Sequence, residues 1–294
     1  GSSMFTVSAM SLLLRIVGPD HRARASSTYQ SGFLFGSLAG PAVGGIIVGL
    51  NIRAPFFFYA LTLTMAACVA YFALPKGIGR PESKDSSAAQ ETAMPLRAAF
   101  KLREYWTALT YNVGTGITTF GMRNALLPLF VIEVLHKPAS WSSIGFLFTS
   151  ITQAACLLPA GRFADLRGRK PSMSIGALVL TLAMTTLWLV ESEASYLIHM
   201  ALVGVGMAFL NSGASAVIGD IVSGRKGGPV VAFYQMTSDF GMIIGPLLAG
   251  FLLDRTASYH EPFGLSLAIA LIVTFFVLTM PETRHRKYAH HSNE

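Results

Sequence analysis

The chain has 294 residues, of which 52% are hydrophobic and only 13% are charged. A soluble domain carries about 25% charged residues, so this composition excludes an ordinary soluble protein and predicts an all-α integral membrane protein. The net charge of +7 does not indicate nucleic-acid binding. Its cations lie in short loops beside apolar segments, where they set the orientation of a membrane protein.

Apolar segments of about 20 residues are long enough to cross a bilayer as helices. Residues 1–15 have the character of the end of one such helix. The long polar segment 76–103, which contains Pro81 and Pro95, is expected to be a linker. About eight full spans are predicted in chain order, at residues 27–50, 54–75, 104–132, 140–161, 172–190, 195–221, 229–254 and 261–280.

The distribution of lysine and arginine predicts which side of the membrane each loop occupies. Of the 22 such residues, Arg53, Lys137 and Arg255 lie on one side and Arg123 lies within a span. All the others lie on the opposite side, which the positive-inside rule makes cytoplasmic. The cytoplasmic segments are therefore expected to be residues 76–103, 162–171, 223–228 and 281–294, which puts the C-terminus inside the cell.

An internal repeat relates the beginning of the chain to its end. Seven residues recur 205 positions later, and the six spans between the copies make both copies run the same way through the membrane. Parallel repeats of this kind build the two halves of some transporters. The first copy consists of Tyr29, Gln30, Phe35, Gly36, Gly40, Pro41 and Gly45, and the second of Tyr234, Gln235, Phe240, Gly241, Gly245, Pro246 and Gly250.

A charged segment between two spans carries the family resemblance. It reads Gly161-Arg162-Phe163-Ala164-Asp165-Leu166-Arg167-Gly168-Arg169-Lys170. Its glycines, Gly161 and Gly168, suit a sharp turn, and cations such as Arg167 and Lys170 suit the inner side of a bilayer. The order of residues resembles the G-x-L-A-D-R-x-G-R-K loop of the major facilitator superfamily of secondary transporters.

This resemblance implies a partial major facilitator fold. Residues 1–75 are then the remainder of an N-terminal six-helix half, 76–103 the central linker, 104–280 the C-terminal half and 281–294 a tail. The repeat aligns residue 1 with the middle of span 195–221, so the chain is similar to the second part of helix four through helix twelve. We therefore expect this chain alone not to transport, for want of the first three helices.

The same resemblance implies a gating role for the charged loop. Asp165 would cap the start of span 27–50 in the other half, and Arg169 would pair with Asp220 at the end of span 195–221. Such a latch would favour the outward-facing state and break as the cytoplasmic side opens. The alternative is that these are solvated charges with no switching role.

A glycine-proline motif lies in span 27–50. Gly36, Gly40, Pro41, Gly44 and Gly45 resemble the G-x-x-x-G-P-x-x-G-G motif in the fifth helix of drug–proton antiporters. Small residues four positions apart also allow ordinary close packing of helices, and proline bends a helix. Gly245 and Pro246 are the second copy of this motif.

Polar residues inside spans are candidates for proton or substrate contact. Charges at membrane depth are costly and face a cavity or a partner, which selects Asp239 and Arg123. Gln235 precedes Asp239 by four positions and shares its helix face. Asn112 is a further candidate for the cavity. For each of these residues a structural hydrogen bond between helices is the alternative.

The predicted function is secondary active transport by alternating access, with proton-coupled efflux of small apolar or cationic compounds. A sugar or metabolite porter of the same superfamily is an alternative, since Pro281-Glu282-Thr283 resembles a sequence that ends the last helix of sugar porters. A truncated, non-transporting membrane protein is an alternative of another class. We expect no enzymatic activity, no cofactor beyond a coupling proton, a lipid bilayer and a small molecule as partners, a monomer, and the inner membrane as location.

Overall fold

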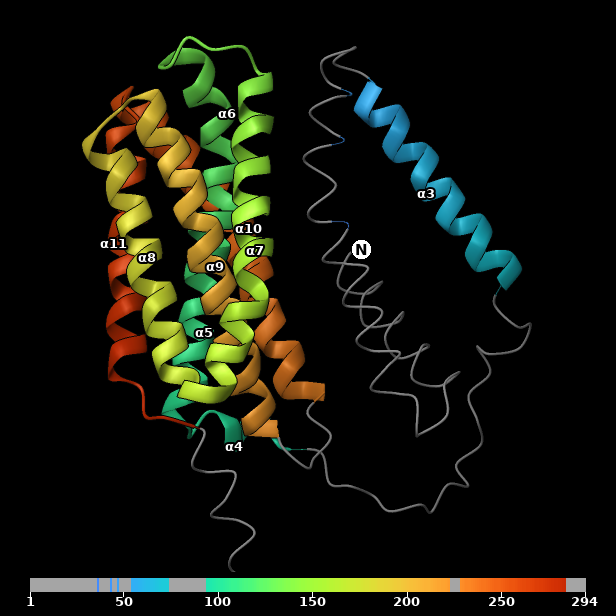
Figure 1. The fold of residues 1–294 in the computed structure, drawn as a ribbon, viewed down its shortest axis with the longest axis vertical. Helices are drawn as coiled ribbons and strands as arrows, with labels where there is room; N and C mark the ends of the chain where they lie inside the picture. The colour runs from blue at the N-terminus through green and yellow to red at the C-terminus, as the bar shows by residue number, and fades with distance from the viewer. Residues whose placement is uncertain are drawn as a thin grey trace, which may run out of the picture. The chain divides into compact units, whose positions relative to one another are not determined.

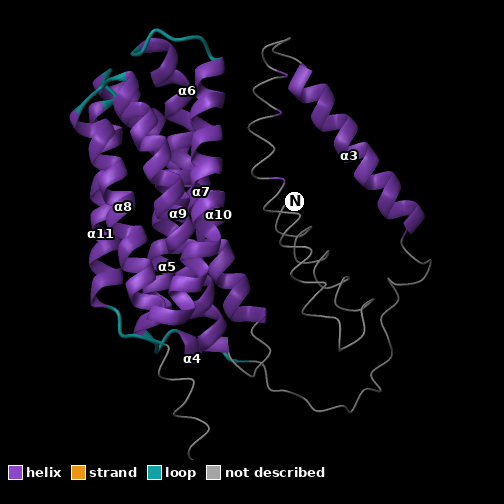
Figure 2. Ribbon diagram, viewed as in Figure 1, coloured by secondary structure: helices purple, strands orange, loops and turns teal. Residues whose placement is uncertain are grey.

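The structure, a computed structural model, describes residues 54–73, 94–222 and 228–283, together with Gly36, Val43 and Ile47. Within these residues the fold is helical and contains no strand (Figures 1 and 2). The elements are α3 (Ala54–Ala73), α4 (Leu96–Ala99), α5 (Arg103–Thr115), the π-helical η2 (Gly116–Met122), α6 (Arg123–Glu133), α7 (Ser140–Arg167), α8 (Arg169–Leu189), α9 (Glu193–Val222), α10 (Gly228–Thr256) and α11 (His260–Thr279).

The chain divides into two compact units, residues 1–89 and 90–294. In the first unit, the described helix α3 exposes large apolar side chains along its length. Phe56 and Phe72, one near each end, are 75% and 82% exposed. A helix of this composition suits contact with lipid or with other apolar helices.

The second unit is a bundle of antiparallel helices. Helices α5, η2 and α6 form one uninterrupted run from Arg103 to Glu133, and α7 to α11 follow in alternating directions (Figure 1). By length and composition, α7, α8, α9, α10 and α11 can each cross a membrane. These helices confirm five of the predicted spans, and α3 and the run from α5 to α6 occupy two more. The predicted span 27–50 and residues 1–15 fall almost wholly outside the described residues.

Small residues let the bundle helices approach closely. A side chain at Gly176 on α8 would lie 2.7 Å from the carbonyl oxygen of Gly206 on α9. Hydroxyl groups add hydrogen bonds between helices: Thr149 on α7 donates to the carbonyl of Met200 at 2.9 Å, and Thr152 donates to that of Ala201 at 3.0 Å. This combination of small residues and hydroxyls is typical of membrane helix interfaces.

The second copy of the glycine-proline motif packs α10 against the π-helical segment. A side chain at Gly121 on η2 would lie 2.8 Å from the Cα atom of Gly245, and one at Gly116 would lie 3.1 Å from the Cα atom of Gly241. The close-packing interpretation therefore holds for this copy. In the first copy, Gly36 is helical and exposed, and Gly40, Pro41, Gly44 and Gly45 lie outside the described residues.

The end of the expected linker lies against the bundle. Residues 94–102 pack there because their apolar side chains find partners. Met94 and Ala99 are buried. The Phe100 ring contacts those of Tyr105 and Phe233 at 5.7 and 5.2 Å between centroids.

Candidate gating site

The turn between α7 and α8 is much shorter than the sequence suggested. Helix α7 continues through Arg167 and α8 begins at Arg169, so only Gly168 interrupts the helical backbone. Gly168 has φ 115° and ψ 163°, a region that is open in practice to glycine alone. The expectation that Gly161 shapes the turn was wrong, because Gly161 lies inside α7. One residue in a backbone conformation reserved for glycine is enough to reverse the chain.

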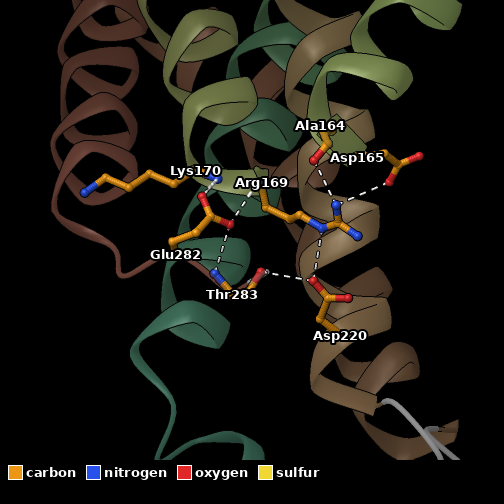
Figure 3. Close-up of polar contacts among 7 residues, drawn as sticks. All are labelled: Ala164, Asp165, Arg169, Lys170, Asp220, Glu282 and Thr283. Atoms are coloured by element: carbon orange, nitrogen blue, oxygen red, sulfur yellow. Dashed lines mark hydrogen bonds and ion pairs between the residues drawn. The ribbon is translucent and has the colours of Figure 1, made fainter. Parts of the chain in front are cut away.

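The guanidinium of Arg169 lies next to the carboxylate of Asp220 (Figure 3). The Arg169 Nε atom is 3.1 Å from Asp220 Oδ2, and both side chains are nearly buried, at 13% and 11% exposed. Arg169 also donates from Nη1 to the carbonyl of Ala164 at 2.8 Å. The structure thus brings together the two residues that the family resemblance paired, and joins the first turn of α8 to the last turn of α9.

Glu282, which sequence analysis did not assign to the site, completes it. Its carboxylate accepts the backbone N–H of Arg169 at 2.9 Å and that of Lys170 at 3.0 Å (Figure 3). These are first-turn N–H groups of α8, which have no partner within the helix and carry the positive end of its dipole. A carboxylate from the segment that follows α11 therefore caps α8.

Thr283 links this cap to the ion pair. Its hydroxyl donates to Oδ2 of Asp220 at 3.1 Å, the same oxygen that contacts Arg169, and its backbone N–H donates to Glu282 at 3.0 Å. Helices α8, α9 and α11 thereby meet in one polar group, called here the charged cluster: Arg169, Asp220, Glu282 and Thr283. The sequence analysis did single out Pro281-Glu282-Thr283, but only for its resemblance to the end of the last helix of sugar porters, which gave no indication of its contact with α8.

The remaining residues of the loop lie at the edge of this cluster. Asp165 is 3.3 Å from Arg169 Nη1, with its side chain 73% exposed. Arg167 lies over the Phe163 ring at 6.0 Å. The Lys170 side chain extends away from Arg169 (Figure 3). The helix start in span 27–50 that Asp165 was expected to cap lies outside the described residues.

Arg123, at the start of α6, is half-buried among neutral groups. Its Nε donates to the carbonyl of Thr119 at 3.1 Å, and its Nη1 donates to the hydroxyl of Thr149 at 3.3 Å. The guanidinium also lies 5.1 Å from the Phe146 ring centroid, a distance that allows a cation–π interaction. Arg123 therefore anchors α6 to α7 inside the bundle.

Asn112 is buried, and its amide donates to the carbonyl of Tyr234 on α10 and, at 3.4 Å, to the hydroxyl of Thr237. This geometry favours the alternative, a structural hydrogen bond between α5 and α10. Gln235, one turn before Asp239 on α10, is exposed, and Asp239 is half-buried.

The opposite end of the bundle has polar contacts of its own, which sequence analysis missed. The Tyr259 hydroxyl donates to Glu133 Oε2 at 2.6 Å, and Lys137 Nζ lies 2.7 Å from Glu193 Oε1. Burial, and then the neighbouring Glu133 carboxylate, raises the pKa of Tyr259 above its ordinary value. Tyr259 thus stays a hydrogen-bond donor at any physiological pH.

Long apolar helices, small-residue interfaces and a charged turn at one end define this chain as a multi-pass membrane protein. The sequence profile of the Major Facilitator Superfamily matches residues 1–149 and 124–294. The chain therefore belongs to the major facilitator superfamily, a family of membrane transporters and not of enzymes.

Several relatives are described as resistance proteins. The chain is 23% identical to the multidrug resistance protein MdtG of Proteus mirabilis over 256 residues, which is 84% of this chain and 62% of the relative. It is 24% identical to multidrug resistance protein 1 of Bacillus subtilis over 260 residues, 86% of this chain and 64% of the relative. It is 26% identical to the chloramphenicol resistance protein of Streptomyces lividans over 283 residues, 92% and 69% respectively. The chain thus spans about two thirds of the length of these relatives.

Proposed function

We propose that, within the protein as its gene encodes it, this chain serves proton-coupled efflux of small apolar or cationic compounds by alternating access. The observation that carries the proposal is the charged cluster, in which the nearly buried pair of Arg169 and Asp220 is joined to Glu282. The resistance functions named for the multidrug and chloramphenicol relatives support efflux as the direction and small organic molecules as the substrate class.

The cluster would act as a latch on the cytoplasmic side. Arg97, Lys101, Arg162, Arg167 and Lys170 surround this end of the bundle, and the positive-inside rule assigns such an end to the cytoplasm of a bacterial inner membrane. With three helix ends held together, this side of the C-terminal bundle is closed. Opening the cytoplasmic side would separate α8 from α9 and break the ion pair between Arg169 and Asp220. The intact cluster therefore favours the outward-facing state.

Asp239 is our candidate for the coupling proton. It lies eleven residues after the start of α10, about 16 Å along the helix at 1.5 Å per residue. A carboxylate at membrane depth can exchange a proton, and its surroundings determine the free energy of the charged form relative to the neutral form. Arg123 serves in this proposal as a fixed positive charge inside the bundle, held by Thr149 and Phe146.

The test is transport by purified protein, prepared as its gene encodes it and reconstituted in lipid vesicles. Ethidium, a lipophilic cation, and chloramphenicol, which the name of a relative suggests, are the probes. We expect a proton gradient to drive movement of at least one probe, Asp239→Asn to abolish the dependence on the gradient, and Asp220→Asn to slow transport several-fold.

Asp254→Asn is the matched control, because it removes an exposed carboxylate at the opposite end of α10. It should leave transport unchanged. Transport of neither probe under any gradient would overturn the proposed efflux function. Full activity of Asp220→Asn would overturn the latch alone, and full gradient dependence of Asp239→Asn would overturn the assignment of the coupling proton.

A further inference from the structure

A small cavity lies inside the C-terminal bundle, among η2, α6, α8, α9 and α11. Its lining includes Thr118, Arg123, Met184, His199, Phe263 and Ser266. It leaves about 10 Å³ for the centre of a water-sized molecule, which is about the least space that can hold one water. Neither the charged cluster nor Asp239 takes part in this cavity.

His199 brings an unsatisfied acceptor to the cavity wall. Its Nδ1 lies 2.8 Å from the carbonyl oxygen of Ala183. A carbonyl oxygen can only accept, so Nδ1 carries the proton and Nε2 of the neutral ring presents a lone pair. His199 is 2% exposed, and its Nε2 has no hydrogen-bond partner among the described residues. Leaving a buried acceptor unpaired costs about 1–3 kcal/mol.

Arg123 brings spare donors to the same cavity. A guanidinium has five N–H groups. Nε donates to Thr119 and Nη1 to Thr149 and the Met200 sulfur, which leaves the two N–H groups of Nη2 for the cavity. Ser266 contributes an acceptor: its hydroxyl proton goes to the carbonyl of Pro262 at 3.0 Å, which leaves lone pairs on Oγ. The cavity is therefore lined by one hydrogen-bond donor, Arg123 on α6, and by two acceptors, His199 on α9 and Ser266 on α11.

We propose that this cavity is a binding site for one water molecule. The water accepts a hydrogen bond from Arg123 and donates its two hydrogens to His199 Nε2 and Ser266 Oγ. Three hydrogen bonds are the usual number for a buried water, and they join α6, α9 and α11 at one point. An anion does not suit the site, because the lone pair on His199 repels negative charge and the space is that of a single water.

This inference does not rest on the proposed transport function, and its test needs no transport measurement. Solid-state NMR of the protein in lipid bilayers, labelled with 15N histidine, reports the protonation of each ring nitrogen. Magnetisation transfer from water reports which rings contact water. The seven histidines in the chain require an assignment, which the loss of one signal in His199→Asn provides. Asparagine retains a donor that can reach Ala183.

We expect His199 to be neutral, protonated on Nδ1, and to receive magnetisation from water at short mixing times. His260, which is exposed at the start of α11, is the reference for a ring in contact with water. In Arg123→Met, which retains a long side chain without donors, the transfer to His199 should fall at least several-fold while the transfer to His260 stays unchanged.

Three results would overturn the proposal: no water transfer to His199, a proton on its Nε2, or a signal that changes when chloride is replaced by a large organic anion. The last would identify an anion as the occupant. Each of these is read on the unaltered protein once the His199 signal is assigned, so a failure of Arg123→Met to fold leaves the test decisive.

Discussion

The carboxylate of Glu282 occupies the space that a side chain at residue 168 would fill. A Cβ atom built on Gly168 would lie 2.6 Å from Glu282 Oε2. Since Glu282 also caps α8 through the N–H groups of Arg169 and Lys170, the glycine and the cap depend on each other. The short turn between α7 and α8 is thus closed by a residue more than a hundred positions away.

Gly168→Ala should destabilise the protein for two reasons. Alanine is strained at φ 115°, which costs about 1–3 kcal/mol, and its methyl group would displace Glu282. The measurement is thermal unfolding in detergent. Gly161→Ala is the control, since Gly161 is helical and has no atom of the described residues within 4 Å of an added Cβ. It should be neutral or raise stability by about 0.5–1 kcal/mol, and equal loss in both variants would contradict the account.

The two carboxylates that contact Arg169 should differ sharply in importance. Asp220→Asn breaks a nearly buried pair, and losing one partner of a buried pair costs about 3–5 kcal/mol, less here because Asn keeps an acceptor for Thr283. Asp165→Asn removes a carboxylate that is 73% exposed, so its cost should stay below about 1 kcal/mol. Chemical or thermal unfolding of both variants tests this order, and a larger loss for Asp165→Asn would contradict it.

Tyr259→Phe should lower stability by about 1 kcal/mol, because it removes the donor to Glu133. The pKa of Tyr259 is raised in the folded protein, so its contribution is fully present below its unfolded pKa of about 10. That contribution is lost as pH rises through the higher folded pKa. The stability difference between the wild-type protein and Tyr259→Phe should therefore be constant from pH 6 to 9 and shrink in more alkaline buffers. A difference that falls between pH 6 and 8 would refute this assignment.

Gly245→Ala should disturb the contact between α10 and η2. The added methyl group would lie 2.7 Å from the Cα atom of Gly121, and overpacking of this kind costs about 1–3 kcal/mol. Gly250→Ala, on the same helix, meets no described atom within 4 Å and serves as the control. Unfolding midpoints of the two variants in detergent should separate, with only Gly245→Ala lowered.

The membrane-length helices were predictable because hydrophobic segments of about 20 residues have few alternatives in a bilayer. Five predicted spans appear as helices α7 to α11. The pairing of Arg169 with Asp220 followed from a ten-residue family resemblance and not from any local rule. Composition could not have linked two residues 51 positions apart.

Other features could not be read from the chain. The segment 161–167 was expected to turn because it is charged and starts with glycine, yet its residues are compatible with a helix and only Gly168 demands another conformation. Nothing in the composition of residues 116–122 distinguishes a π-helix from an α-helix. The partners of Glu282, Tyr259 and Asn112 are decided by which helix ends and faces meet in space, which a linear sequence does not state.

The contact between η2 and α10 has a mechanical consequence. At Gly116, Gly121, Gly241 and Gly245 the two helices meet backbone to backbone, without side chains that interlock. Pulling these surfaces apart loses all of their van der Waals attraction at once. Sliding one helix along the other preserves most of that attraction and requires no rotamer change at these four positions. At these four positions the interface therefore resists separation more than axial displacement, and the hydrogen bonds of Asn112 to Tyr234 and Thr237 are what fix the axial position of α10.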